Sequence, residues 1–194
     1  FLFMAIGKSM PYLIFIIYPQ IINYFPKPGK WFFYLKYFFA FLLIFNLLKV
    51  NYFNPIVAIF VKVYKPLSKI LPMLINPIVN IFVIAVIVKL LSLIVYFGNQ
   101  YETVALLGVA IIQTIMVTLR IIFFAVIGGV ILSWVAPEKS NAFLELVTEI
   151  SYKTMSPIRK YIPSAGGLDF SPLFVLIIIN LLESFLSDIL RSIV

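Results

Sequence analysis

The chain has 194 residues, of which 63% are hydrophobic and 11% are charged, and its formal net charge is +8. Soluble domains carry about a quarter of their residues as charged side chains, so this composition excludes an ordinary soluble domain and indicates an integral membrane protein. Cysteine and histidine are both absent, which excludes Cys/His metal sites, thiol nucleophiles and a histidine general base. We expect no metal and no cofactor.

The apolar runs are long and continuous, without the ten-residue alternation of a membrane barrel, so we expect helices. The first of them lies in the N-terminal segment, residues 1–30. Its apolar part, Met10–Phe25, contains two prolines and no small-residue cleavage site, and its 16 residues are short for a span of about 20. We interpret it as a re-entrant element, an interfacial element or an extra helix.

Four longer apolar segments predict transmembrane helices: Trp31–Val50, Ile78–Phe97, Val104–Val135 and Pro172–Val194. The first two have 20 residues each, enough for about 30 Å of helix. The third has 32 residues, so it must tilt, kink near Gly128 and Gly129, or extend into water.

The connection between the first two segments predicts a basic helix. Asn54 and Pro55 form a helix cap and first-turn pair at its start. Five apolar side chains then fall on one helical face, and three lysines fall opposite: Ile56, Ile59, Phe60, Val63 and Leu67 against Lys62, Lys65 and Lys69. This pattern is typical of an amphipathic helix that lies flat in the headgroup plane.

The connection between the last two segments predicts a second surface helix. Its apolar face comprises Phe143, Leu146, Val147 and Ile150, and its polar face comprises Glu145, Glu149 and Lys153. Glu149 and Lys153 have the spacing of an i,i+4 ion pair. We expect this helix, too, to lie on the membrane.

The two connections match as a tandem repeat. Asn54 aligns with Asn141 at an offset of 87, and KILP at Lys69–Pro72 aligns with KYIP at Lys160–Pro163 at an offset of 91. The repeats are residues 31–97 and 104–194, each a span, a surface helix and a span. Two spans separate the basic connections, which therefore share one side of the membrane, and their lysines and arginines predict that this side is cytoplasmic. Lys27 and Lys30 argue against this orientation, because they would lie on the opposite side of the membrane, just before the first span.

The loop SPIRKYIPSAGGLDFSP before the last span is a candidate binding surface. Gly166 and Gly167 allow the chain to reverse at the membrane surface, and Asp169 lies near the positive end of the helix that Ser171 and Pro172 begin. Arg159 and Lys160 face the anionic leaflet. The loop is either a tight re-entry turn with basic anchors or a docking surface for a partner; it lacks the spacing of a Walker or dinucleotide motif. The predicted partner- or lipid-binding residues are Lys62, Lys65, Lys69, Arg159, Lys160, Gly166, Gly167 and Asp169.

Polar side chains inside the spans are the second group of candidates: Lys89, Gln113, Arg120, Asn180 and Glu183. Lys89, Arg120 and Glu183 lie near mid-membrane by helical rise, where a lone charge costs several kcal/mol. We therefore expect an ion pair between Arg120 and Glu183, with Lys89 as a possible third member, and a polar stripe of the last span that faces other helices. The alternatives are a proton or ion path, and snorkelling of Lys89 or Arg120.

The runs SWVAPEKSN at Ser133–Asn141 and SPIRKYIPSAGGLDFSP at Ser156–Pro172 resemble the signature of the YggT/YlmG family, and YKPLSKILP at Tyr64–Pro72 resembles a shortened first copy. The first copy lacks the glycine loop and the paired arginines, and Lys160 stands where the family usually has arginine. The resemblance implies a bacterial inner-membrane protein. It also implies links to the assembly of membrane complexes, to division loci and to osmotic tolerance, without an established catalytic activity.

These patterns together predict an all-helical polytopic membrane protein with four spans in two tandem repeats. The favoured function is a non-enzymatic scaffold or assembly factor whose basic surface helices bind anionic lipids and other membrane proteins. The alternative is a subunit of an oligomeric ion or small-solute pathway built from copies of the chain. Nucleic acid is not an expected partner, because no recognition fold accompanies the basic residues.

Overall fold

The computed structural model describes residues 30–70, 76–97, 100–135, 141–162 and 169–193, and within these ranges it contains helices and turns but no strand. The six helices are α3 (Lys30–Leu47), α4 (Pro55–Ile70), α5 (Pro77–Phe97), α6 (Thr103–Val135), α7 (Ala142–Arg159) and α8 (Ser171–Ile193). The all-helical prediction is confirmed. The predictions for the N-terminal element Met10–Phe25 and for the loop glycines Gly166 and Gly167 fall outside the described residues.

Three helices are long and apolar enough to cross a membrane, namely α5, α6 and α8, and α3 contributes a shorter apolar segment, Tyr34–Leu47. The chain is therefore a multi-pass membrane protein. Helix α6 has 33 residues and continues as one helix through Gly128 and Gly129. The long segment predicted at Val104–Val135 is therefore a single unbroken helix.

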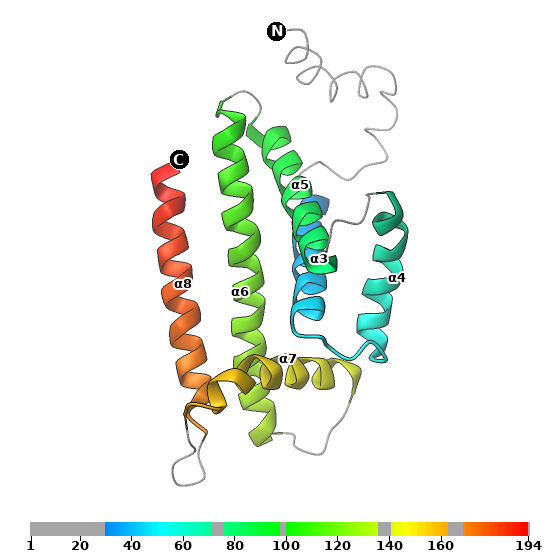
Figure 1. Cartoon of the computed structure of the whole chain (residues 1–194), viewed down its shortest axis with the longest axis vertical. Coiled ribbons are helices and arrows are strands. Elements are labelled where there is room, and N and C mark those ends of the chain that lie inside the picture. Colours follow the sequence, from blue (N-terminus) through cyan, green and yellow to red (C-terminus); the bar gives the residue numbers. More distant parts are fainter. Residues whose placement is uncertain (1–29, 71–75, 98–99, 136–140, 163–168, 194) are drawn as a thin grey trace.

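The fold is a helical bundle built around α6, which packs against α3, α5, α7 and α8. Figure 1 shows α3, α5, α6 and α8 side by side, with α7 lying across one end of the bundle. The largest group of buried side chains lies at that end, where α3, α4, α6, α7 and α8 meet, and it includes Phe45, Val57, Val126, Ile150 and Val175. The end of the bundle that carries α7 therefore holds the largest part of the described hydrophobic core.

Helix α7 crosses α6 at Gly128 and Gly129. A Cβ atom on Gly129 would lie 2.3 Å from the Ser151 Oγ atom and 2.4 Å from its Cβ atom, and a Cβ atom on Gly128 would lie 3.0 Å from Val147. Ser151 is buried, and its hydroxyl donates to the Val126 carbonyl at 3.5 Å. The two glycines thus allow the helix axes to approach closely, which holds α7 flat across the bundle.

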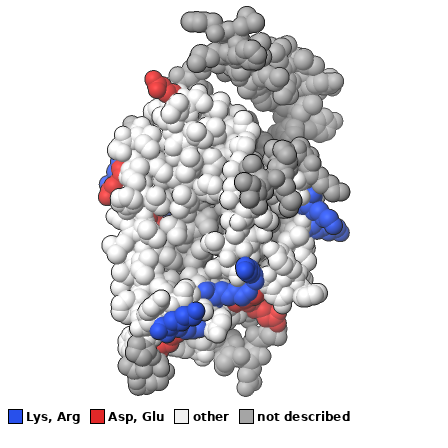
Figure 2. Space-filling model, in the orientation of Figure 1, with Lys and Arg blue, Asp and Glu red and all other residues white. Residues whose placement is uncertain are grey.

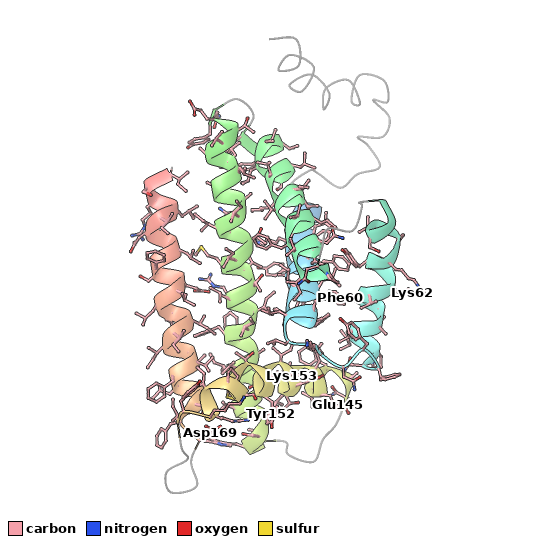
Figure 3. The ribbon with its side chains drawn as sticks, viewed as in Figure 1. Phe60, Lys62, Glu145, Tyr152, Lys153 and Asp169 are labelled. Atoms are coloured by element: carbon pink, nitrogen blue, oxygen red, sulfur yellow. The ribbon has the colours of Figure 1, made fainter. Side chains whose placement is uncertain are left out.

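Helix α4 does not lie flat, so that prediction is wrong. Figure 1 shows α4 upright beside the bundle, roughly parallel to its neighbours, whereas α7 runs across the end. The reason is aromatic packing: the Phe60 ring lies 5.2 Å from that of Phe38, 5.6 Å from Phe41 and 5.5 Å from Phe45. These three rings follow one another along α3, and the Phe60 ring lies against all of them, which holds α4 beside α3 (Figure 3).

Helices α4 and α7 differ in the size of the residues at the positions that would have to cross. At the offset of 87 residues that matches Asn54 to Asn141, Gly129 corresponds to Leu42 and Ser151 corresponds to Tyr64. Leu42 is fully buried, and a leucine opposite a tyrosine leaves no room for two helix axes to cross as closely as α6 and α7 do. The small residues of the second copy are therefore what permits the flat arrangement.

The predicted cap at Asn54 is confirmed, and Asn141 caps α7 in the same way. The Asn141 side chain accepts hydrogen bonds from the Phe143 and Leu144 N–H groups at 3.0 and 2.9 Å. Asn54 accepts from the Ile56 N–H group at 3.0 Å, and its amide donates to the Ala142 carbonyl at 2.7 Å. Asn54 thus caps α4 and also joins the N-termini of α4 and α7.

Candidate functional site

A set of polar contacts that we call the connection latch ties α7 to the segment between α3 and α4. The predicted i,i+4 ion pair is confirmed, with Lys153 Nζ 2.8 Å from Glu149 Oε1. The same carboxylate accepts from the Asn51 N–H group at 2.9 Å, and the Lys153 ammonium also donates to the Lys49 carbonyl. Lys49 has a left-handed backbone with φ of 51°, and it follows the C-terminal end of α3. Two charged groups of α7 thereby satisfy backbone groups of the segment between α3 and α4.

The second set of contacts, which we call the Arg159 cluster, consists of Tyr152, Arg159, Lys160 and Asp169. Arg159 Nε donates to Asp169 Oδ2 at 2.8 Å, and the guanidinium lies 4.9 Å from the centroid of the Tyr152 ring. About a third of each charged side chain remains exposed, 34% for Arg159 and 37% for Asp169. Because this pair neutralises itself, exposed Lys160 supplies the net positive charge of the cluster.

Asp169 also caps the last helix, since its Oδ1 atom accepts from the Ser171 N–H group at 2.9 Å. The expected capping role therefore belongs to Asp169, while the Ser171 hydroxyl is buried and has no hydrogen-bond partner among the described residues. Burial acts to raise the pKa of Asp169, but the hydrogen bonds that its carboxylate accepts from the Ser171 N–H group and from Arg159, together with the Arg159 charge, outweigh it. The pKa of Asp169 consequently lies below its usual value of 3.8.

The predicted binding residues do not form one continuous patch. Lys62 and Lys65 are exposed on α4, and Lys62 points away from the bundle (Figure 3). On the face shown in Figure 2, basic side chains gather over α7 at one end and separately over α4 at the edge of the molecule. The side chain of Lys69 is outside the described part. Because α4 stands upright, its lysines are at a different level from the Arg159 cluster.

The predicted ion pair between Arg120 and Glu183 is present, but it lies at the outer surface of the bundle and not inside it. Arg120 Nη2 donates to Glu183 Oε2 at 3.0 Å, and Arg120 Nε lies 3.4 Å from Glu183 Oε1. The pair joins α6 to α8, and it is asymmetric: the Arg120 side chain is 63% exposed and the Glu183 side chain is 16% exposed. The arginine thus lies on the outer surface of the bundle.

Lys89 does not join this pair. With Gln113 and Lys36, it lines a cavity of about 10 Å³ between α3, α5 and α6, close to the Thr114 hydroxyl. That volume holds about one water molecule. The structure therefore divides the intramembrane polar residues into two groups, one around Lys89 and Gln113 and the other around Arg120 and Glu183.

Asn180 and Ser184, two members of the polar stripe of α8, do not face other helices of the chain, which corrects the expectation for this part of the stripe. Asn180 and Ser184 are exposed, and the Asn180 amide donates only to the Leu176 carbonyl of its own helix, at 3.0 Å. Only 11% of the residues in an 18-residue apolar stretch of α8 are buried within the chain. The helix lies at the edge of the bundle, so one chain offers no partner for this side of the stripe.

Comparison with known proteins places these residues in a family. A chain of Haemophilus influenzae described as an uncharacterized protein is 32% identical over 147 residues, which covers 73% of this chain and 79% of the relative. Residues 108–190 match the family described as CCB3/YggT. The chain belongs to the CCB3/YggT family.

Further relatives of this CCB3/YggT chain are also without an assigned function. An uncharacterized protein of Pseudomonas aeruginosa is 31% identical over 149 residues, covering 72% of this chain and 76% of the relative. The uncharacterized protein YggT of Escherichia coli K12 is 25% identical over 151 residues, covering 73% and 77%. No solved structure matches the chain. The family match contains the Arg159 cluster and the intramembrane pair of Arg120 and Glu183.

Sequence reasoning missed three contributors to these sites in the CCB3/YggT chain. Tyr152 could have been found, because it precedes Arg159 by seven residues and thus shares its helical face. Ser151 gives no comparable signal, since its importance depends on which part of α6 it crosses. The backbone of Lys49 is recognised across 104 residues of sequence, and no local pattern marks such a contact.

Proposed function

We propose that this protein is a non-enzymatic scaffold or assembly factor of the bacterial inner membrane. The observation that carries the proposal is the fixed position of α7: its crossing with α6 is close at Gly129, and the connection latch holds its polar side. A helix held at two places loses little additional conformational freedom on binding, so it suits recognition. The Arg159 cluster at its C-terminal end offers an aromatic ring, an ion pair and an exposed lysine to a partner or an anionic headgroup.

The proposal includes a membrane topology of four spans in two tandem repeats, with α3 as the fourth span and the end of the bundle that carries α7 in the cytoplasm. Since the chain contains no cysteine, single cysteines report topology directly. We expect Glu102→Cys to react with an impermeant maleimide on spheroplasts, and Lys160→Cys to react only after permeabilisation. The reverse labelling would contradict the orientation, and labelling of both positions on intact spheroplasts would contradict the number of spans.

The test of the scaffold function is isolation of the tagged chain from native membranes in nanodiscs, followed by mass spectrometry. We expect stoichiometric membrane proteins to accompany the chain and to be lost when Arg159, Lys160 and Asp169 are replaced by alanine. The matched control replaces Lys62 and Lys65, which are exposed basic residues distant from the cluster, and should retain the partners. A chain that is isolated alone, or partners that survive the triple substitution, would contradict the proposal.

The second candidate function is an ion or small-solute pathway linked to osmotic tolerance. It is favoured by the polar cavity around Lys89 and Gln113, although a volume of about 10 Å³ requires an opening or a neighbouring copy for passage. Flux assays in liposomes test it with Lys89→Met and Glu183→Gln. A flux in the natural chain that these substitutions abolish, with unchanged folding, would favour the pathway over the scaffold.

A further inference from the structure

A polar surface lies at mid-membrane depth on the outside of α6 and α8, and we call it the α6–α8 face. It consists of Arg120, Asn180, Glu183 and Ser184. Asn180 and Ser184 lie 9 and 13 residues beyond the first residue of α8, which is about 14 and 20 Å by helical rise. Arg120 is 63% exposed at the level of Glu183, to which it is bonded. Hydrocarbon surrounds this depth of a bilayer and cannot satisfy such groups.

The hydrogen-bonding capacity of the face is only partly used. A guanidinium has five N–H donors, and Arg120 directs two of them at Glu183, which leaves three without a partner among the described residues. Asn180 donates one bond to Leu176, and its carbonyl oxygen accepts none within the described part of the chain. Donors and acceptors are thus both available on one surface.

We propose that a second copy of this chain packs against the α6–α8 face, related by a two-fold axis along the membrane normal. Both copies must have the same orientation in the membrane, so such an axis places each residue at the depth of its counterpart. Arg120 and Glu183 are already at one depth, because they are bonded to each other. The two-fold axis therefore sets the Arg120 of each copy opposite the Glu183 of the other, in a ring of alternating charge.

The same symmetry supplies the remaining partners. Asn180 of one copy faces Asn180 of the other, and a primary amide both donates and accepts, so it is self-complementary. Polar side chains of this kind form hydrogen bonds between transmembrane helices. The charge pattern therefore selects a copy of the same chain over a purely apolar helix, and the inference is independent of the proposed scaffold function.

Disulfide cross-linking in native membranes tests the interface, since the chain has no cysteine of its own. We expect Asn180→Cys and Ser184→Cys to form disulfide-linked homodimers on oxidation with copper phenanthroline, at least about tenfold more than Leu182→Cys. Leu182 is the matched control: it is 44% exposed and lies two residues from each test position, about 200° around the helix. Absence of homodimers at both test positions would overturn the proposal. Equal cross-linking of Leu182, or adducts that contain a different protein, would overturn it as well.

A second measurement does not depend on cysteine chemistry. Native mass spectrometry from nanodiscs should find the natural chain as a dimer and the double variant Arg120→Gln, Glu183→Gln as a monomer. The double variant removes both charges together, so neither charge is left unpaired within the chain. A natural chain that is monomeric would refute the interface, and so would a double variant that remains a dimer.

Discussion

Gly129 is the position at which a single added carbon tests why α7 lies flat. A Cβ atom there would lie 2.3 Å from the Ser151 Oγ atom and 2.4 Å from its Cβ atom. The Oγ atom can rotate away, but the Ser151 Cβ atom is fixed to the backbone, so the helices themselves must separate. Overpacking of this depth costs about 3 kcal/mol, and the better helix propensity of alanine offsets about 1 kcal/mol of it. We therefore expect Gly129→Ala to lose about 2 kcal/mol.

The assay is the thermal midpoint in nanodiscs followed by circular dichroism, in which a loss of this size lowers the midpoint by about 4–8 °C. Gly108→Ala in the same helix is the matched control. A Cβ atom on Gly108 would lie 3.3 Å from the terminal Cδ1 atom of Ile193, which can rotate away. That variant should be as stable as the natural chain or slightly more stable.

A double-mutant cycle identifies the cause of the loss. Ser151→Gly removes both overlapping atoms and leaves the Ser151 Cα atom at 3.9 Å, an ordinary contact. In that background only the better helix propensity of alanine remains, so Gly129→Ala should gain about 1 kcal/mol, which corresponds to a coupling of about 3 kcal/mol. The reasoning is refuted if Gly129→Ala is as stable as Gly108→Ala, or if it loses the same amount in both backgrounds.

Three further predictions concern the charged contacts. Glu149→Ala should lower stability by about 1.5–3 kcal/mol, because the Asn51 N–H group and Lys153 lose a charged partner; thermal midpoints measure this. Glu183→Gln should lower stability by about 2.5–3.5 kcal/mol, the cost of an unpaired arginine at mid-membrane, as measured by the same midpoints. Folding lowers the pKa of Asp169, so the stabilisation from its charge is fully present above about pH 3.8. This stabilisation is lost as the pH falls through the lowered pKa of the folded state. The thermal midpoints of the natural chain and of Asp169→Asn should therefore converge below that pKa.

Each of these has its own control. For Glu149, the neighbouring substitution Glu145→Ala removes an exposed carboxylate for which no ion pair is found among the described residues, and it should change the midpoint little. For Glu183, neutralising Arg120 as well should recover most of the loss; a Glu183→Gln variant that folds normally but loses ion flux would favour the pathway. For Asp169, a gap between the two chains that persists unchanged to pH 2 would show that its charge does not contribute.

Much of the fold could be predicted because it depends on local patterns. The cap at Asn54 predicts the start of α4, the amphipathic pattern predicts α7, and the continuous apolar runs predict α5, α6 and α8. The pair of Arg120 and Glu183 could be predicted as well, because helical rise places both at one depth and a bilayer disfavours a lone charge there.

The parts that could not be predicted depend on which surfaces meet. Helical periodicity gives α4 and α7 the same amphipathic character, but Phe60 packs lengthwise on α3 while Ser151 crosses α6 at a glycine. The α8 stripe was expected to face other helices, since hydrophobic patterning indicates which side is polar without indicating how many helices surround it. The exposure of Asn180 could therefore be recognised only from the arrangement of the helices in the structure.

The claim that α7 presents a binding surface is tested most directly by photo-crosslinking in living cells. A photoreactive amino acid replaces Tyr161, which is 86% exposed beside the Arg159 cluster, or Phe53, which is 94% exposed near the opposite end of α7. The account predicts adducts with specific membrane proteins from Tyr161 that disappear when Arg159, Lys160 and Asp169 are replaced by alanine, and none of these adducts from Phe53. Identical protein adducts from both positions, or lipid adducts alone from Tyr161, would contradict it.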